Sequence, residues 1–139
     1  NPDVQVTAVE QFLTAENAAE ILAGHHLVLD ALDSISHRLM LQRICRELQI
    51  PLVHGAVEGW FGQVTTVLPG DDSLYRLYHG ATEASAPESS VGTWAFAPAL
   101  VAALQTGEAV KLLLDREPAL RGKVLFVDIL QNRFDAMPL

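Results

Sequence analysis

The feature that most constrains the fold of this chain is the stretch LVLDALDSISHR at residues 27–38. An apolar run ends at Asp30, and Asp33 and Ser34 follow immediately before a helical pattern. This order predicts a short buried strand, a turn that carries carboxylates, and a capped helix. In open α/β sheets, ligands bind beyond the carboxyl ends of the strands. The turn is therefore the first candidate for a functional site.

Length and composition limit the classes of protein that fit. A chain of 139 residues, half of them hydrophobic and 19% charged, predicts one folded domain and excludes a disordered chain. The net charge of −8 argues against a nucleic-acid partner, which needs clustered Lys and Arg. No uninterrupted apolar run reaches the ~18 to 20 residues of a membrane span, so we expect no membrane partner. Cys45 is the only cysteine, which excludes an intrachain disulfide and favours a cytoplasmic location.

Periodicity and turn residues predict the remaining elements. Residues 92–115 are so rich in Ala and Leu that we expect one long helix buried on most sides, packed on a sheet or on a partner. Together the patterns predict a mixed sheet flanked by helices, parallel in its first part and antiparallel in its second. The other expected elements are a strand at 4–9, a short helix ending at Gly24, a helix at 34–49, a strand pair at 52–57 and 62–68, a surface crossover or mobile loop at 72–91, and strands at 123–129 and 133–137.

Several motifs, in their order and spacing, resemble the ThiF/MoeB/HesA family, the bacterial relatives of ubiquitin-activating enzymes. They are NP at the start, LVLDALDSISHR, IPLVHGAVEGWFGQV, LPGD, LQTGEAVKLLL and GKVLFVD, and they extend over residues 1–134. The resemblance implies a partial Rossmann-like, ThiF-type fold with a nucleotide site at the carboxyl ends of the parallel strands. It also implies an adenylyltransferase that uses ATP and Mg²⁺. Its substrate would be the C-terminal glycine of a small ubiquitin-like or sulfur-carrier protein, and family members commonly form homodimers.

The resemblance also assigns site residues. Asp33 matches the family's acid beside the triphosphate. For Asp33 the resemblance therefore implies a catalytic role, contact with the nucleotide, and Mg²⁺ binding through ATP. Ser34 stands where the family usually has asparagine, beside the nucleotide, and Arg38 matches a catalytic arginine. Asp30 matches a first acid with a structural role. The residues alone favour helix capping for Asp33, and capping is compatible with a nucleotide role.

The departures from the family pattern concern the phosphate loop, zinc and thiol chemistry. No G-x-G-x-x-G precedes Asp33, so we expect residues 1–139 to be the C-terminal part of a ThiF-like domain, truncated at its N-terminus and inactive alone. The family's first C-x-x-C pair would fall at 74–77, where both positions are leucine, so we expect no zinc site. A reactive cysteine is absent from residues 87–92, where Ser89 and Ser90 have no sign of an activating base.

Two functions therefore stay open: part of an adenylating enzyme, or a non-catalytic ThiF-like scaffold that binds a carrier protein. Cys45 follows the pattern of a buried core residue more closely than that of a nucleophile. The five histidines show no helical metal motif such as H-E-x-x-H. By position alone, Tyr75, Tyr78 and the loop after them are candidates for a docking surface.

Overall fold

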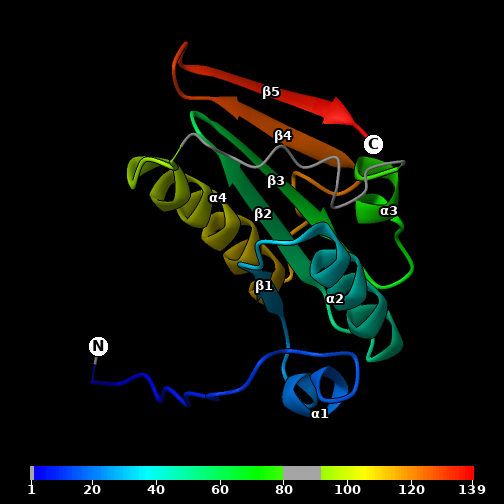
Figure 1. The fold of residues 1–139 in the computed structure, drawn as a ribbon. Helices are drawn as coiled ribbons and strands as arrows, with labels where there is room; N and C mark the ends of the chain where they lie inside the picture. The colour runs from blue at the N-terminus through cyan, green and yellow to red at the C-terminus, as the bar shows by residue number, and fades with distance from the viewer. Residues whose placement is uncertain (1, 80–91) are drawn as a thin grey trace.

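The computed structural model describes residues 2–79 and 92–139, which form a sheet with helices on both faces (Figure 1). The sheet has five strands in the order β1-β2-β3-β4-β5. In chain order the elements are α1 (Ala18–Leu22), β1 (Val28–Asp30), α2 (Ile35–Glu47), β2 (Leu52–Glu58), β3 (Phe61–Val67), α3 (Ser73–Leu77), α4 (Phe96–Leu113), β4 (Lys123–Asp128) and β5 (Arg133–Pro138).

The pairing of the strands confirms the predicted mixed sheet. β1 pairs with β2 in parallel, and the later pairs, β2 with β3, β3 with β4 and β4 with β5, are antiparallel. Parallel neighbours need a crossover, which α2 provides, whereas the short turn after Glu58 makes β2 and β3 a hairpin. The parallel register places Asp30, the last residue of β1, beside His54 of β2.

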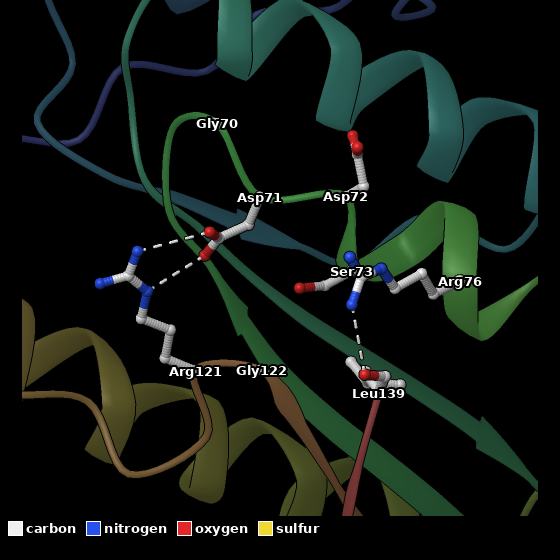
Figure 2. A pocket seen from close by; sticks show the side chains of 8 residues that line it. All are labelled: Gly70, Asp71, Asp72, Ser73, Arg76, Arg121, Gly122 and Leu139. Atoms are coloured by element: carbon white, nitrogen blue, oxygen red, sulfur yellow. Dashed lines mark hydrogen bonds and ion pairs between the residues drawn. The ribbon is translucent and has the colours of Figure 1, made fainter.

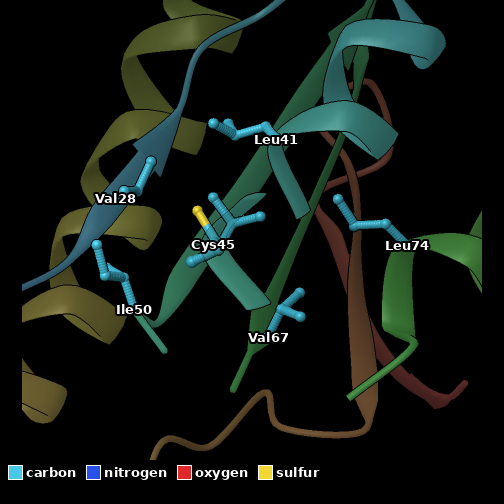
Figure 3. Close-up of a cluster of buried hydrophobic side chains, with 7 residues drawn as sticks. Val28, Leu41, Cys45, Ile50, Val67 and Leu74 are labelled. Atoms are coloured by element: carbon cyan, nitrogen blue, oxygen red, sulfur yellow. The ribbon is translucent and has the colours of Figure 1, made fainter. Parts of the chain in front are cut away.

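Adjacent residues of β2 belong to two different cores. Leu52 and Val53 are both fully buried, and they face opposite sides of the sheet because side chains alternate along a strand. Leu52 packs in the core beneath α2 and α3, together with Val28, Leu41, Cys45, Ile50, Val67 and Leu74 (Figure 3). Val53 packs in the core beneath α4, together with Val64, Val101, Ala109 and Leu120.

The close approach of α4 depends on glycines in the hairpin below it. A Cβ atom at Gly62 of β3 would collide with the Val101 side chain, and one at Gly55 of β2 would collide with the amide of Gln105. Glycine therefore lets α4 lie directly against the backbones of the two strands.

The predicted strand at residues 4–9 is wrong. This segment forms neither helix nor strand, and Val4, Val6 and Val9 are exposed. An alternating pattern favours a strand, but a strand also needs a neighbour for its backbone hydrogen bonds. Among the described residues, no strand pairs with this segment.

The predicted crossover at residues 72–91 was only partly correct. It contains the short helix α3, which packs on β3 and α2 and buries Ser73 and Leu74. A helix of this length has too few residues to show a helical period, so the pattern missed it. Residues 80–91, including Ser89 and Ser90, lie outside the described part of the chain.

The long helix is shorter and more exposed than predicted. α4 begins at Phe96 and ends at Leu113, and its outer side exposes Val110 together with Leu113 and, just after the helix, Leu114. The sheet covers one side of the helix, as expected, and no other described element covers the opposite side, so burial on most sides would need the partner that the sequence also allowed. By length and composition α4 would suffice to cross a membrane, although Glu108 and Lys111 interrupt it. The core helix of a sheet protein passes the same test, and α4 packs on β2 and β3.

Candidate functional site

The turn between β1 and α2 presents the first predicted site residue, Asp33, to solvent. Its side chain is exposed, and none of the described residues forms a hydrogen bond or ion pair with its carboxylate. The residue that caps α2 is Ser34, whose Oγ accepts from the backbone N–H of His37 at 3.3 Å. The prediction that Asp33 caps α2 is therefore wrong, because the capping residue is the next one along the chain. The Asp33 carboxylate is left available for a ligand.

Immediately behind this turn lies a buried carboxylate–imidazole pair. Asp30 Oδ2 lies 2.6 Å from Nδ1 of His54, and both side chains are fully buried. The other carboxylate oxygen, Oδ1, accepts from the backbone N–H of Leu32 at 2.8 Å. Burial lowers the pKa of His54 below its ordinary value, and the hydrogen bond that its Nδ1–H donates to the Asp30 carboxylate opposes this shift without cancelling it. The imidazole is therefore neutral near pH 7.

Tyr78 and Arg38 extend this pair toward the turn. The Tyr78 hydroxyl lies 3.0 Å from His54 Nε2, and it accepts from Gln63 Nε2 at 2.7 Å and from Arg38 Nη1 at 3.1 Å. The Arg38 guanidinium also donates to the Leu32 carbonyl, from Nε at 3.0 Å and Nη2 at 2.8 Å. Burial raises the pKa of Tyr78, so its hydroxyl keeps its proton. These groups connect β1, α2, β2, β3 and the residue after α3.

The opposite side of the β1–β2 pair is fixed by α4. Gln105 Nε2 donates to the backbone carbonyls of Asp30 at 2.8 Å and Val53 at 3.1 Å. Gln105 itself is buried, so its amide replaces the water that these two carbonyls would otherwise need. The end of β1 is thus held from both faces of the sheet.

The predicted site residues lie together at this turn but differ in their contacts. Asp33 and Ser34 are neighbours at the carboxyl end of β1. Arg38 lies one turn into α2, and its guanidinium contacts the protein's own Leu32 carbonyl and Tyr78 hydroxyl. The structure therefore shows Arg38 anchoring the turn.

Sequence reasoning did not predict the contacts of three polar residues of this region: His54, Tyr78 and Gln105. For His54 the available signal was a histidine within an otherwise apolar strand. A buried imidazole needs a hydrogen-bond partner, and the parallel neighbouring strand ends in an acid, Asp30. Tyr78 was predicted as part of a docking surface, but it is half-buried and bonded to its neighbours. For Gln105 the signal was a polar residue facing the sheet from an apolar helix.

A cavity of about 180 Å³ lies elsewhere, between the β3–α3 connection and the start of β4 (Figure 2). Its charged groups already have partners, since Arg121 pairs with Asp71 and Arg76 donates to the Leu139 carbonyl. None of the predicted site residues lines it. In residues 2–79 and 92–139, no group of three or more His, Cys, Asp or Glu side chains is arranged to hold a metal ion.

The fold and the turn define an α/β protein with a candidate ligand site at the carboxyl end of a parallel strand. More specifically, the chain belongs to the ThiF family, which it matches over residues 1–139. It is 40% identical over 141 residues to the SAMP-activating enzyme E1 of Haloferax volcanii, covering 99% of this chain and 52% of that protein. It is 35% identical to the sulfur carrier protein adenylyltransferase of Thermus thermophilus, covering 96% of this chain and 52% of that protein.

Solved structures agree with this fold. The crystal structure of E. coli MccB with ATP superposes with a TM-score of 0.75 over 99% of this chain and 43% of that chain, at 12% sequence identity. At this identity the likeness shows the fold alone. The chain spans about half the length of the curated relatives it matches, 52% in both cases above.

Proposed function

We propose that this chain is part of an ATP-dependent adenylating enzyme that activates the C-terminal glycine of a small ubiquitin-like or sulfur-carrier protein. The observation that carries the proposal is the exposed, unpartnered carboxylate of Asp33 at the carboxyl end of β1 in a chain of the ThiF family. The names of the two relatives, an activating enzyme for SAMP and an adenylyltransferase for a sulfur carrier, support the kind of partner.

The chemistry activates a poor electrophile. An oxygen of the carrier's terminal carboxylate attacks the α-phosphorus of ATP, a new P–O bond forms, and the bond to the leaving pyrophosphate breaks. Mg²⁺ is held in such sites by one or two carboxylates together with phosphate oxygens and water, and it neutralises the phosphate charge. An exposed carboxylate at a strand end fits that requirement, so Asp33 is the residue that would hold the metal. Ser34 beside it caps α2 and would face the nucleotide.

The resemblance implied a catalytic role for Arg38 at this site, whereas the contacts of its side chain support a different role. Its guanidinium donates to the Leu32 carbonyl and to the Tyr78 hydroxyl, so it holds the residue that precedes Asp33. We therefore propose a positioning role for Arg38.

Two further properties belong to the proposal. The enzyme forms a homodimer, which the apolar side chains of Val110, Leu113 and Leu114 on the outer side of α4 support, because they are 46%, 59% and 62% exposed. It works in the cytoplasm, which the single buried, free thiol of Cys45 supports.

ATP–pyrophosphate exchange in the full-length natural protein, with a carrier that ends in Gly-Gly, tests the proposal. Replacing Asp33 by Ala should lower the exchange rate by about 100-fold or more, because the metal loses its protein ligand. Asp135→Ala is the matched control, since it removes an exposed acid from the edge strand β5 and should leave exchange unchanged.

The outcomes separate the enzyme from the scaffold. A folded Asp33→Ala protein with undiminished exchange would overturn the role of Asp33. A wild-type protein that binds the carrier without any exchange would instead establish the non-catalytic scaffold.

A further inference from the structure

The hydrogen bonds behind the β1–α2 turn form a closed ring. Asp30 bonds the N–H of Leu32, and Arg38 bonds its C=O. Arg38 continues to the Tyr78 hydroxyl, which meets His54, and His54 returns to Asp30. Both backbone polar groups of Leu32 are therefore held by the same ring, and Asp33 is the next residue.

The chemistry of the side chains determines which atom donates and which accepts in each hydrogen bond of the ring. The Asp30 carboxylate only accepts, so His54 Nδ1 carries the proton and donates to it. His54 Nε2 then has a lone pair and accepts from the Tyr78 hydroxyl. The Tyr78 oxygen in turn accepts from Arg38 and Gln63. Each member thus determines the orientation of the next, and with these assignments every donor in the ring meets an acceptor.

We propose that Tyr78 and His54 are positioning residues for the Asp33 carboxylate: by closing the ring around Leu32, they hold the turn in the geometry in which Asp33 meets the metal–nucleotide complex. This inference rests on the proposed function. A site residue on a loop reaches the precision of one on a strand only when a supporting shell holds its backbone. A misplacement of about 1 Å is enough to cost about 100-fold in rate.

The ring also explains why these polar groups are buried. A hydrophobic side chain at His54 would pack between β2 and the helices without any need for partners. The buried imidazole instead requires an aspartate on β1 and a tyrosine after α3. The ring therefore links the turn to three separate parts of the fold.

The test measures pyrophosphate exchange in the full-length natural protein carrying Tyr78→Phe, which removes one hydroxyl and opens the ring. The rate constant kcat should fall about tenfold, while the KM for the carrier changes less than twofold, because the turn carrying Asp33 moves and the carrier surface does not. Thr7→Val, which removes an exposed hydroxyl from the N-terminal segment outside the ring, is the control and should match wild type. Arg38→Lys keeps the charge but cannot bridge Leu32 and Tyr78, so it should reproduce the loss if Tyr78→Phe does not fold.

A double-mutant cycle with Asp33→Ala distinguishes positioning from general stability. If Tyr78 acts through Asp33, Tyr78→Phe should cause no further loss of exchange in the Asp33→Ala background. A full tenfold loss in that background, or no loss in the wild-type background, overturns the inference and leaves the proposed function intact. An Asp33→Ala protein with normal exchange overturns the proposed function itself.

Discussion

At the scale of single residues, His54 makes folding sensitive to pH. Its pKa is lowered by burial, so between the ordinary value near 6.5 and the lowered value the unfolded chain binds a proton that the folded chain does not. The contribution of neutral His54 to stability is complete above pH 6.5 and decreases as the pH falls through that window. The titratable groups that face it are Asp30, Arg38 and Tyr78.

Urea unfolding from about pH 7.5 to about pH 5.5 checks this prediction. The unfolding free energy of the wild type should decrease as the pH falls, and His54→Gln should show a shallower dependence from a lower starting stability. His79→Gln, at an exposed histidine, is the control and should keep the wild-type slope. Equal slopes for His54→Gln and wild type would contradict the assignment.

Cys45 should not react in the folded protein. Burial, with a smaller effect of the Asp30 charge, raises the pKa of its thiol to about 11, and the thiolate is the reactive form. Iodoacetamide near pH 8 should leave the native protein unmodified and should alkylate the same thiol completely in urea. Rapid labelling of the native protein would show that the core around Cys45 opens.

At the scale of elements, Glu108 attaches α4 to the sheet. Its carboxylate accepts from the Thr66 hydroxyl at 2.9 Å and from the backbone N–H of Leu120 at 3.1 Å, and it pairs with Lys111. Burial acts to raise the pKa of Glu108, but these donors outweigh it and the net pKa lies below the ordinary value. The carboxylate is therefore ionised at neutral pH, and it joins α4 to β3 and to the connection that precedes β4.

Glu108→Ala should destabilise the protein by about 2–4 kcal/mol, because it leaves the Thr66 hydroxyl and the Leu120 N–H buried without an acceptor. Glu108→Gln keeps one acceptor oxygen and should cost less. The exposed Glu117→Ala variant should change the unfolding free energy by less than about 0.5 kcal/mol. Denaturant unfolding measures all three, and a Glu108→Ala protein as stable as wild type would refute the attachment.

Elements with a strong local pattern were predictable. The helix expected at 34–49 is observed as α2, Ile35–Glu47, and the expected strand pair is observed as β2 and β3. The failures occur where the deciding contact is distant. The 4–9 segment alternates like a strand but has no neighbour in the described structure, and α3 is stabilised by packing on β3 and α2 rather than by its own period.

The same distinction applies to the candidate site. The location of Asp33 after a buried strand followed from the residues between 27 and 38, because the strand, turn and helix are adjacent in sequence. The ring behind it depends on the register of β1 against β2 and on a tyrosine that is 24 residues from His54 along the chain. Register and crossover geometry are set by packing of the whole sheet, which a local pattern does not contain.

At the scale of the whole molecule, the two faces of the sheet are covered to different extents. α2 and α3 bury a continuous core on one face, whereas α4 on the other face leaves an apolar outer side. Val110, Leu113 and Leu114 lie close together in sequence at the end of this helix, with exposed fractions of 46% to 62%. An apolar surface of this kind favours association with another surface like it, which is the basis of the proposed homodimer.

Leu113→Glu in the full-length natural protein tests this interface, because a charge at a desolvated contact between copies is strongly unfavourable. Light scattering after size exclusion should show a dimer for wild type and a monomer for Leu113→Glu, with unchanged circular dichroism. Arg116→Glu, at an exposed position just beyond the helix, also introduces a negative charge and should stay dimeric. A wild-type monomer would overturn the proposed homodimer. A Leu113→Glu dimer of wild-type affinity would place the contact between copies on another surface.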